Sequence, residues 1–414
     1  MRQFESLPRQ ETTIGASLAS FQKHLQQCGT SFSEHLRAAH VNRWQSDTLR
    51  HALTVRTALV LGLQEFLVSR GILNIDRVSL SPVTDPLCHD VEHVPVISYQ
   101  GTAYRTTHSM IYSKMLACVA PGIKGVYIDS PNIRLELPSS SMRGKYLIDF
   151  SQMDIEVKRA SMLSEDDYFD QPEAIAASLA EERDRALDFF EDMIIHAVRK
   201  ILALASESLE ALGVQLAIPA KPFPRFYKDE EPDHQDPMLE ARLGGKAKAQ
   251  FFWVLGLLRE NYDLVYPYLQ RDGSRIAKSS IRSRQVYNYD LCAAPLYADG
   301  SLGRAYEVLS GGLREWVHSA IVARLLDNGI LQEPPRFDDS GNILNMEALD
   351  GYGPFLAVTA MRDSDGRPIF PQTFGGGLGI ERTLFALLHG PQAQTIDQLT
   401  CFGKNPDREL PFLF

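Results

Sequence analysis

A glycine-rich run near the C-terminus is the stretch best suited to bind a nucleotide. It reads Phe-Gly-Gly-Gly-Leu-Gly-Ile-Glu-Arg over residues 374–382, with Gly375, Gly377 and Gly379 at alternate positions. A strand face without side chains lets a flat ligand lie against the backbone. Arg382, at the expected start of a helix, carries a planar and permanently charged fork that suits a purine face or a phosphate. The same pattern also fits a strand packed closely under a helix, so other motifs must decide.

Two familiar nucleotide fingerprints are excluded. A dinucleotide fingerprint needs its third glycine three residues after the second, and Ile380 occupies that position. No lysine followed by serine or threonine ends the glycine run, which excludes a P-loop. The run therefore predicts a nucleotide site of another kind.

Two polar strands in the first half of the chain are expected to form an antiparallel hairpin. On the first, Arg134 and Glu136 share a face. On the second, four side chains alternate with apolar or small ones and share a face: Phe150, Gln152, Asp154 and Glu156. A buried face that carries a cation, an amide and three carboxylates needs partners or a ligand for them. The alternative is a polar strand side that faces solvent.

A third polar segment places two adjacent glycines between an acid and a cation. Gly311 and Gly312 allow close backbone approach to a small ligand. Glu307 precedes them and Arg314 follows them, while Asp290 lies upstream on another expected strand. Asp290 and Glu307 together predict a Mg²⁺ site, because that ion prefers a few carboxylates plus phosphate oxygens. Without the other motifs these residues would be ordinary strand-end acids.

Taken together, these motifs resemble motifs 2 and 3 of the class II aminoacyl-tRNA synthetases, in their aspartate and asparagine branch. Residues 71–82 resemble a degenerate motif 1, which builds the dimer interface in that family. The chain is also similar to the archaeal asparagine synthetases related to asparaginyl-tRNA synthetase, over the segments 81–87, 107–111, 130–136, 150–160 and 310–316. The resemblance covers about residues 50–400. It implies a free-standing catalytic core that uses ATP and Mg²⁺.

At the nucleotide end, the resemblance implies a role for each motif residue. Arg134 would grip the α-phosphate and stabilise the charge that develops during adenylation. Arg382 would stack on the adenine or hold the γ-phosphate, and Phe150 would stack on the other adenine face. Glu136 would accept a hydrogen bond from the adenine amino group. Two residues of the bare strand would line the ATP site: Gly377 and Gly379.

At the amino-acid end, the resemblance implies that Arg314 pairs with a substrate carboxylate. Three residues would hold the substrate amino group: Gln152, Asp154 and Ser109. Two pairs complete the site: Gly311 and Gly312 against the substrate, and Asp290 and Glu307 on Mg²⁺. The chain departs from the family where the tRNA ligases of this branch usually carry a glutamine and an arginine, at Met110 and at Lys145-Tyr146.

Composition predicts a soluble, cytoplasmic protein. The 414 residues are 44% hydrophobic and 23% charged, and the net charge of −10 disfavours general nucleic-acid binding. Five scattered cysteines without a CxxC pair indicate a reduced compartment. One group, Cys88 with His89 and His93, lacks a convincing fourth zinc ligand. We expect no signal peptide and no membrane span, because no run approaches the ~18 apolar residues that a span needs.

The elements expected to position these residues are long helices and short strands. Apolar spacing predicts helices over 51–70, stopped by Gly71, and over 171–212 and 315–326. Strands are expected at 73–80, 124–128, 146–158, 251–257, 285–291 and 304–310 and in the glycine run. The Pro-rich residues 219–250 are typical of an exposed loop. The pattern predicts an α+β fold with an antiparallel β-sheet flanked by helices.

The expected domain organisation is a helical extension over residues 1–50 and one class II synthetase-like catalytic domain over 51–414. A helical and loop insertion is expected within this domain, at about residues 165–250. The motif 1 resemblance favours a homodimer.

The resulting prediction is an ATP-dependent amide-forming ligase similar to asparagine synthetase. A carboxylate of aspartate, or of a similar amino acid, would attack the α-phosphate to give an acyl-adenylate and pyrophosphate. Ammonia or another amine would then displace AMP. The alternative is an aminoacyl transferase of the Asp or Asn type that acts on tRNA or on a protein side chain. A non-catalytic paralogue is disfavoured because four site residues are retained: Arg134, Glu307, Arg314 and Arg382.

The choice between these two enzymes rests on the N-terminal region. The tRNA ligases of this branch place an anticodon-binding OB barrel ahead of motif 1, whereas only about fifty residues precede it here, and they are not strand-rich. Together with the acidic net charge, this disfavours tRNA as a partner.

Overall fold

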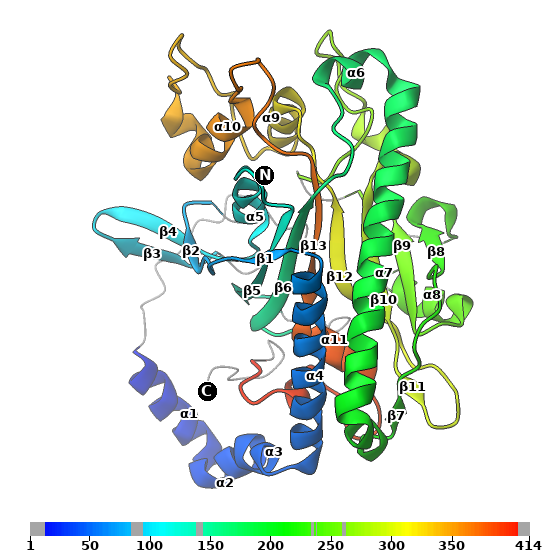
Figure 1. Cartoon of the computed structure of the whole chain (residues 1–414). Coiled ribbons are helices and arrows are strands. Elements are labelled where there is room, and N and C mark those ends of the chain that lie inside the picture. Colours follow the sequence, from blue (N-terminus) through cyan, green and yellow to red (C-terminus); the bar gives the residue numbers. More distant parts are fainter. Residues whose placement is uncertain are drawn as a thin grey trace.

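A largely antiparallel sheet of eight strands organises the protein. The computed structural model describes residues 13–83, 94–137, 144–232, 236, 238–258 and 262–404. The strand order is β1-β5-β6-β13-β12-β10-β9-β8 (Figure 1). These strands are β1 (Leu73–Asn74), β5 (Gly125–Ile133), β6 (Asp149–Lys158), β13 (Thr373–Gly379), β12 (Tyr306–Leu313), β10 (Asn288–Ala293), β9 (Phe251–Leu255) and β8 (Arg225–Tyr227). Within this sheet only the edge pairs β1–β5 and β8–β9 are parallel, so the predicted α+β class is confirmed.

Two long helices run side by side along one face of the sheet: α4 (Asp47–Ser69) and α7 (Pro172–Ala211) (Figure 1). Gly62 permits their close approach, because a Cβ at this position would lie 2.8 Å from the Cα of Ala197. On the sheet side of α7, the ring of Phe190 packs against Phe374 and Tyr289. The hydrophobic core therefore lies between this helix pair and the sheet.

Helix α4 confirms the helix predicted over 51–70. It begins at Asp47, where the Ser46 hydroxyl accepts a hydrogen bond from the backbone N–H of Leu49 (3.1 Å), and Gly71 in a left-handed conformation follows its end. Of the described helices, α4 alone is long and apolar enough to cross a membrane, by length and composition, with a mean hydropathy of 1.3. In that apolar window 44% is buried inside the protein, where α4 packs along α7.

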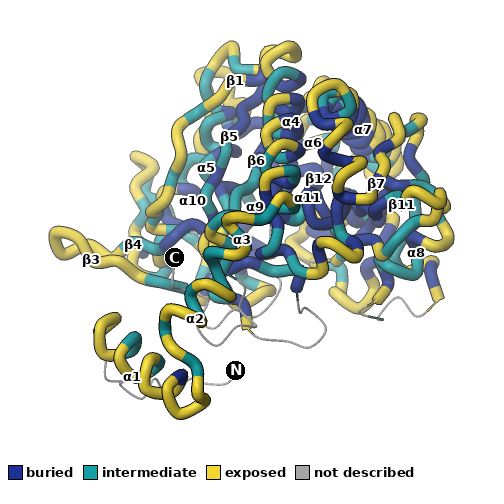
Figure 2. The backbone as a smooth tube through the Cα atoms, turned by 90° about the horizontal axis from the view of Figure 1, so that it is seen from below, coloured by how far each residue is buried: buried dark blue, intermediate teal, exposed yellow. Residues whose placement is uncertain are grey.

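Shorter elements surround this frame. The helices are α1 (Ile14–Gln27), α2 (Phe32–Leu36), α3 (Asn42–Trp44), α5 (Ile111–Ala117), α6 (Glu165–Asp170), α8 (Leu239–Ala247), α9 (His318–Asp327), α10 (Gly353–Ala360) and α11 (Ile380–Leu388). Two small sheets are formed by β2 (Leu80–Ser81), β4 (Thr102–Thr106) and β3 (Val96–Tyr99), and by β11 (Leu296–Tyr297) and β7 (Val214–Gln215). Figure 2 shows that α1 and the β3–β4 hairpin are largely exposed, whereas the central sheet is buried.

Three predicted elements differ from the structure. The strand expected over 73–80 is wrong, because the chain leaves the sheet after Asn74 and pairs again only at Leu80. The exposed loop expected over 219–250 is also wrong in part, because it contains β8 and α8. Phe226 of β8 packs on Phe252, and Leu243 of α8 is buried, so apolar residues between the prolines carry this segment into the fold. The polar strand expected to carry Arg134 and Glu136 on one face is wrong at its end, because β5 stops at Ile133 and both residues follow it. The other predicted helices and strands are present with shifted ends.

Candidate functional site

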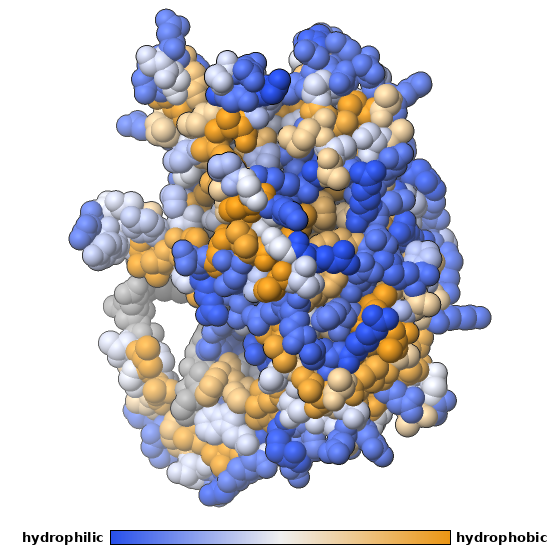
Figure 3. Space-filling view, in the orientation of Figure 1, coloured by the Kyte–Doolittle hydropathy of each residue, from blue (hydrophilic) through white to orange (hydrophobic). Residues whose placement is uncertain are grey.

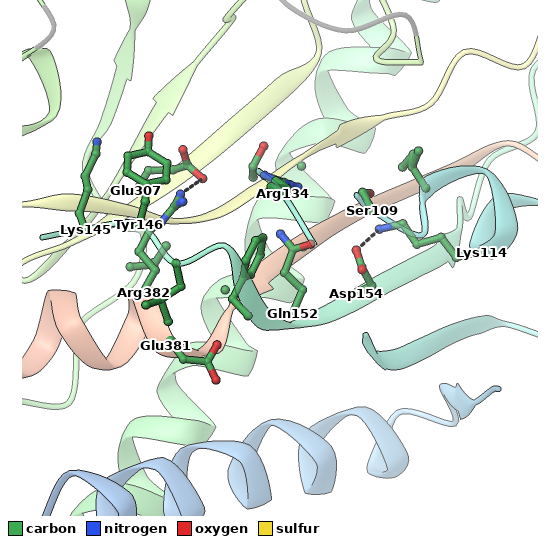
Figure 4. Close-up of a pocket in the computed structure, with 18 of the residues that line it drawn as sticks. Ser109, Lys114, Arg134, Lys145, Tyr146, Gln152, Asp154, Glu307, Glu381 and Arg382 are labelled. Carbon is green, nitrogen blue, oxygen red and sulfur yellow. Dashed lines mark hydrogen bonds and ion pairs between the residues drawn. The ribbon is translucent and has the colours of Figure 1, made fainter. Parts of the chain in front are cut away.

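A cavity opens on the sheet face opposite α7. Neighbouring residues of β13 show the two faces. A Cβ on Gly376 would lie 3.4 Å from Phe190 of α7, whereas one on Gly377 would lie 3.0 Å from Nε2 of Gln152. The cavity holds about 1060 Å³ of empty space with its open mouth included. Residues of β6, β12, β13, α5 and α11 line it (Figure 4).

The cavity brings together most of the residues predicted from the sequence. Those in its lining are Ser109, Arg134, Phe150, Gln152, Asp154, Glu307, Gly311, Arg314, Gly377, Gly379 and Arg382. Three predicted residues do not belong to the lining: Glu136, Asp290 and Gly312. Glu136 is buried, and a Cβ on Gly312 would meet Asn288 and Asp263, which itself lines the cavity.

The glycines of β13 have two different tasks. Gly377 and Gly379 line the cavity, so this part of the strand is bare on the ligand side as the sequence predicts. Gly375 serves another purpose, because a Cβ there would overlap the carboxylate of Glu156 on the neighbouring strand β6. The first glycine of the run thus makes room for a buried protein carboxylate.

Arg134 lies at the centre of the cavity and its direction is fixed by the backbone. Its Nε and Nη2 both donate to the carbonyl oxygen of His108, at 3.0 and 2.9 Å. The guanidinium also lies 5.2 Å from the ring centroid of Phe150. One edge of the Arg134 guanidinium is therefore held by the protein backbone, and its planar face lies over the Phe150 ring. Such an arrangement orients a cation before a ligand arrives.

At one end of the cavity, Arg382 of α11 lies between an acid and an aromatic ring. Its Nη1 is 3.5 Å from Oε1 of Glu307, and its guanidinium is 4.9 Å from the ring centroid of Tyr146 (Figure 4). Lys145 lines the same end. This end offers two cations and aromatic surface, which suits a purine and phosphates.

The opposite end holds a buried network of charges. Lys114 of α5 lies 3.0 Å from Oδ1 of Asp154 and 3.7 Å from Oε2 of Glu156, and its side chain is 1% exposed (Figure 4). Arg314 donates to Glu156 (3.1 Å) and to Asp263 (2.9 Å). Burial alone lowers the pKa of the Arg314 guanidinium, but the Glu156 and Asp263 carboxylates outweigh it and raise that pKa. Arg314 therefore stays charged.

Three carboxylates and two cations meet in this network, and a third buried cation, Arg324, donates to the backbone carbonyl oxygen of Asp263. Asp154 is 1% exposed, and its Oδ2 has no hydrogen-bond partner among the described residues. A buried carboxylate oxygen without a partner is costly unless a ligand satisfies it. The end near Asp154 is therefore suited to a group that carries N–H donors and a positive charge.

The acids predicted to hold Mg²⁺ lie close together, although only one of them lines the cavity. Asp290 opposes Ser310, and Cys292 opposes Glu307, across strands β10 and β12. Burial raises the pKa of the Cys292 thiol, and the carboxylates of Glu240, Asp290 and Glu307 raise it further. Within the described residues, no three His, Cys, Asp or Glu side chains form a complete metal cluster. The donor set fits an ion such as Mg²⁺ that takes its remaining ligands from substrate phosphates.

Some cavity residues were missed by the sequence analysis. They are Lys114, Tyr262, Asp263 and Glu381. Lys114 lies within one helix turn of the segment 107–111, which was already part of the resemblance, so helix spacing could have placed it near Ser109. Asp263 lies in an irregular segment and has no local signal. Cys88, His89 and His93, weighed above as zinc ligands, lie outside the described residues.

In sequence and in fold, the chain is similar to known tRNA ligases. No protein-family model matches the chain. In sequence, the chain is 22% identical over 380 residues to an aspartate–tRNA(Asp/Asn) ligase from Methanoculleus marisnigri, and the match covers 88% of this chain and 70% of that ligase.

Two solved structures share the fold. The asparaginyl-tRNA synthetase of Pyrococcus horikoshii complexed with asparaginyl-adenylate has a TM-score of 0.60 at 16% identity, covering 88% of this chain and 70% of that one. The asparaginyl-tRNA synthetase of Entamoeba histolytica has a TM-score of 0.61 at 13% identity, covering 91% and 72%. The chain thus has the fold of a class II aminoacyl-tRNA synthetase catalytic core. Because these relatives are tRNA ligases, the finer resemblance to asparagine synthetase stays a prediction, and the prediction against tRNA gains no support.

Proposed function

We propose that the protein is an ATP-dependent, AMP-forming ligase that activates an amino acid of the aspartate or asparagine type as its adenylate. The observation that carries this proposal is the setting of Arg134, which the His108 carbonyl and the Phe150 ring hold at the centre of the cavity. On one side lie the aromatic and cationic groups around Arg382, and on the other lies the buried charge network around Asp154. The cavity thus offers a nucleotide end and an amino-acid end with an arginine between them.

In the proposed first step, a carboxylate oxygen of the amino acid attacks the α-phosphorus of ATP. The new O–P bond forms while the bond from the α-phosphorus to its bridging oxygen breaks, and pyrophosphate leaves with that oxygen. Arg134 would neutralise the charge that develops on the α-phosphoryl oxygens. Mg²⁺ bound near Glu307 would supply further charge neutralisation at the phosphates. In the second step a nucleophile attacks the acyl carbon, and AMP leaves.

The amino-acid end supports a substrate with an ammonium group. Oδ2 of Asp154 is buried and needs a donor, which an ammonium group would supply. In this setting Arg314 would contribute less to binding the substrate carboxylate than the family resemblance implies. Its guanidinium already pairs with Glu156 and Asp263, so it would shape the pocket and offer at most its remaining N–H groups to a substrate carboxylate.

Two acceptors compete for the second step. The similarity to tRNA ligases supports transfer to tRNA or a related acceptor, and it supports this better than transfer to ammonia. Amide formation with ammonia or another amine is the second candidate. The resemblance of the segments 81–87, 107–111 and 130–136 to the archaeal asparagine synthetases supports it.

Product analysis separates these candidates. The protein would be incubated with ATP, Mg²⁺ and L-aspartate or L-asparagine, with ammonium or total tRNA added in parallel, and the products scored by mass spectrometry. The proposal predicts AMP and pyrophosphate in an amino-acid-dependent reaction. Aminoacyl-tRNA would select the first candidate, and asparagine formed from aspartate and ammonium would select the second. ADP and phosphate as the only nucleotide products would contradict the proposal.

A further inference from the structure

The orientation of the Gln152 side chain is set from behind the cavity. Asn132 lies on β5 opposite Phe150 of β6, and its side chain is fully buried. Its Nδ2 donates to the backbone carbonyl oxygen of Ser130 (3.2 Å) and to Oε1 of Gln152 (3.1 Å). A backbone carbonyl only accepts hydrogen bonds, so it fixes Nδ2 of Asn132 on this side. The atom of Gln152 that receives the second N–H must then be its oxygen.

This fixes the group that Gln152 presents to a ligand. With Oε1 held by Asn132, the Nε2 amide group of Gln152 lies over the bare strand, 3.0 Å from the position that a Cβ on Gly377 would take. An amide nitrogen donates hydrogen bonds and cannot accept one from an ammonium group. Gln152 therefore faces the cavity as a donor, next to the unpartnered acceptor Oδ2 of Asp154.

The Asn132 amide is only partly hydrogen-bonded, which lowers the stability of the fold. Its Oδ1 is buried and has no hydrogen-bond partner among the described residues, and the same holds for the Ser130 hydroxyl. An unsatisfied buried acceptor is destabilising, so an apolar side chain of similar shape would suit this position better if only packing mattered. The hydrogen bond to Gln152 explains why an amide occupies this buried position.

We propose that Asn132 is a positioning residue that makes Gln152 a hydrogen-bond donor to an oxygen of the amino-acid substrate. This inference rests on the proposed function for the identity of that ligand. It replaces the role implied by the family resemblance, in which Gln152 holds the substrate amino group. That task falls to Asp154, whose spare oxygen accepts. Gln152 instead binds the carboxyl or carbonyl oxygen of the acyl group.

Three variants test the proposal. Asn132→Leu removes the donor, Asn132→Asp replaces it with an acceptor, and Ser130→Ala is the matched control, because this equally buried hydroxyl makes no hydrogen bond within the described chain. In amino-acid-dependent ATP–pyrophosphate exchange, both Asn132 variants should raise the KM for the amino acid roughly 5- to 100-fold, as loss of one buried hydrogen bond does. The KM for ATP should change less than about threefold, and Ser130→Ala should match the wild type.

The pH profile separates positioning from a merely structural role. In Asn132→Asp the introduced carboxyl can donate to Gln152 while protonated and cannot when ionised, so the amino-acid KM should worsen as pH rises, unlike that of the wild type. A lower amino-acid KM in Asn132→Asp would overturn the proposal, because it would mean that the substrate prefers the oxygen of Gln152. Equal KM values in all three variants would overturn it as well.

The geometric claim is tested apart from activity. With selectively ¹⁵N-labelled glutamine, the side-chain amide resonance of Gln152, assigned by its loss in Gln152→Met, should shift in Asn132→Leu and stay in place in Ser130→Ala. An unshifted resonance in Asn132→Leu would overturn the proposal even if no substrate had been found. Absence of exchange in the wild type with every amino acid would instead contradict the proposed function.

Discussion

At the scale of single residues, Arg134 carries the proposed chemistry. Because its guanidinium is held in place by His108 and Phe150, little reorganisation is needed when charge develops on the α-phosphate. Arg134→Ala should lower ATP–pyrophosphate exchange by about 10²-fold or more. The thermal unfolding midpoint should change little, since this side chain is only half-buried. An unaltered exchange rate in a folded variant would refute the assignment.

We expect Lys114 to contribute mainly to the free energy of unfolding rather than to catalysis. Its ammonium group is buried between Asp154 and Glu156. Removing one partner of a buried ion pair leaves an uncompensated charge and typically costs about 3–5 kcal/mol. Lys114→Met should lower the free energy of unfolding by this amount in denaturant titration. Lys145→Met, on the same cavity but partly exposed over the Tyr146 ring, is the control and should cost less than about 1 kcal/mol.

At the scale of elements, strand β13 makes a prediction about neighbouring glycines. A Cβ on Gly375 would overlap the Glu156 carboxylate, so Gly375→Ala should destabilise the fold. A Cβ on Gly377 would enter the cavity beside Gln152 and Asp154, so Gly377→Ala should raise the KM for substrates while leaving the unfolding midpoint nearly unchanged. Thermal unfolding and steady-state kinetics of both variants check this. Equal loss of stability in the two would contradict the division of tasks along the strand.

The element scale also shows what the sequence could and could not predict. Alternation along β6 correctly placed Phe150, Gln152 and Asp154 on the cavity face, because a strand fixes side-chain direction with a period of two. The strand predicted over 73–80 failed because alternation cannot tell whether a partner strand continues. Asp263 could not be found at all, since only the tertiary fold brings it to Arg314.

Gly312 and Asp290 were misplaced for a related reason. Both lie on strands that border the cavity, but Asp263 and Asn288 cover Gly312, and Asp290, which pairs with Ser310, does not reach the lining. Pairing register and the register shift between Leu291 and Cys292 come from the folded sheet. Neither can be predicted from the sequence alone.

At the scale of the whole molecule, the predicted homodimer can be tested through an exposed apolar surface. Val68, Leu73 and Leu80, in or beside the region that resembles motif 1, are 61%, 50% and 42% exposed. Apolar patches interrupt the polar surface on the face that carries α4 and α7 (Figure 3). Such patches mark interfaces more often than free surface. The wild type should therefore sediment at twice the 46.4 kDa of one chain.

A charge placed on this surface should separate the two copies. Val68→Glu should shift sedimentation towards the monomer, whereas Met361→Glu, another exposed apolar position, should leave it unchanged. Analytical ultracentrifugation of the three proteins at matched concentrations decides the matter. A monomeric wild type would contradict the predicted dimer, whereas the proposed function does not depend on this result.

The measurement that tests the central claim most directly is ATP–pyrophosphate exchange with the unmodified protein. Labelled pyrophosphate would be incubated with ATP, Mg²⁺ and either L-aspartate, L-asparagine or no amino acid. We predict that label enters ATP only when one of these amino acids is present, because a reversible adenylate forms in the cavity. Exchange with neither amino acid, by a protein shown to bind ATP, would contradict the account.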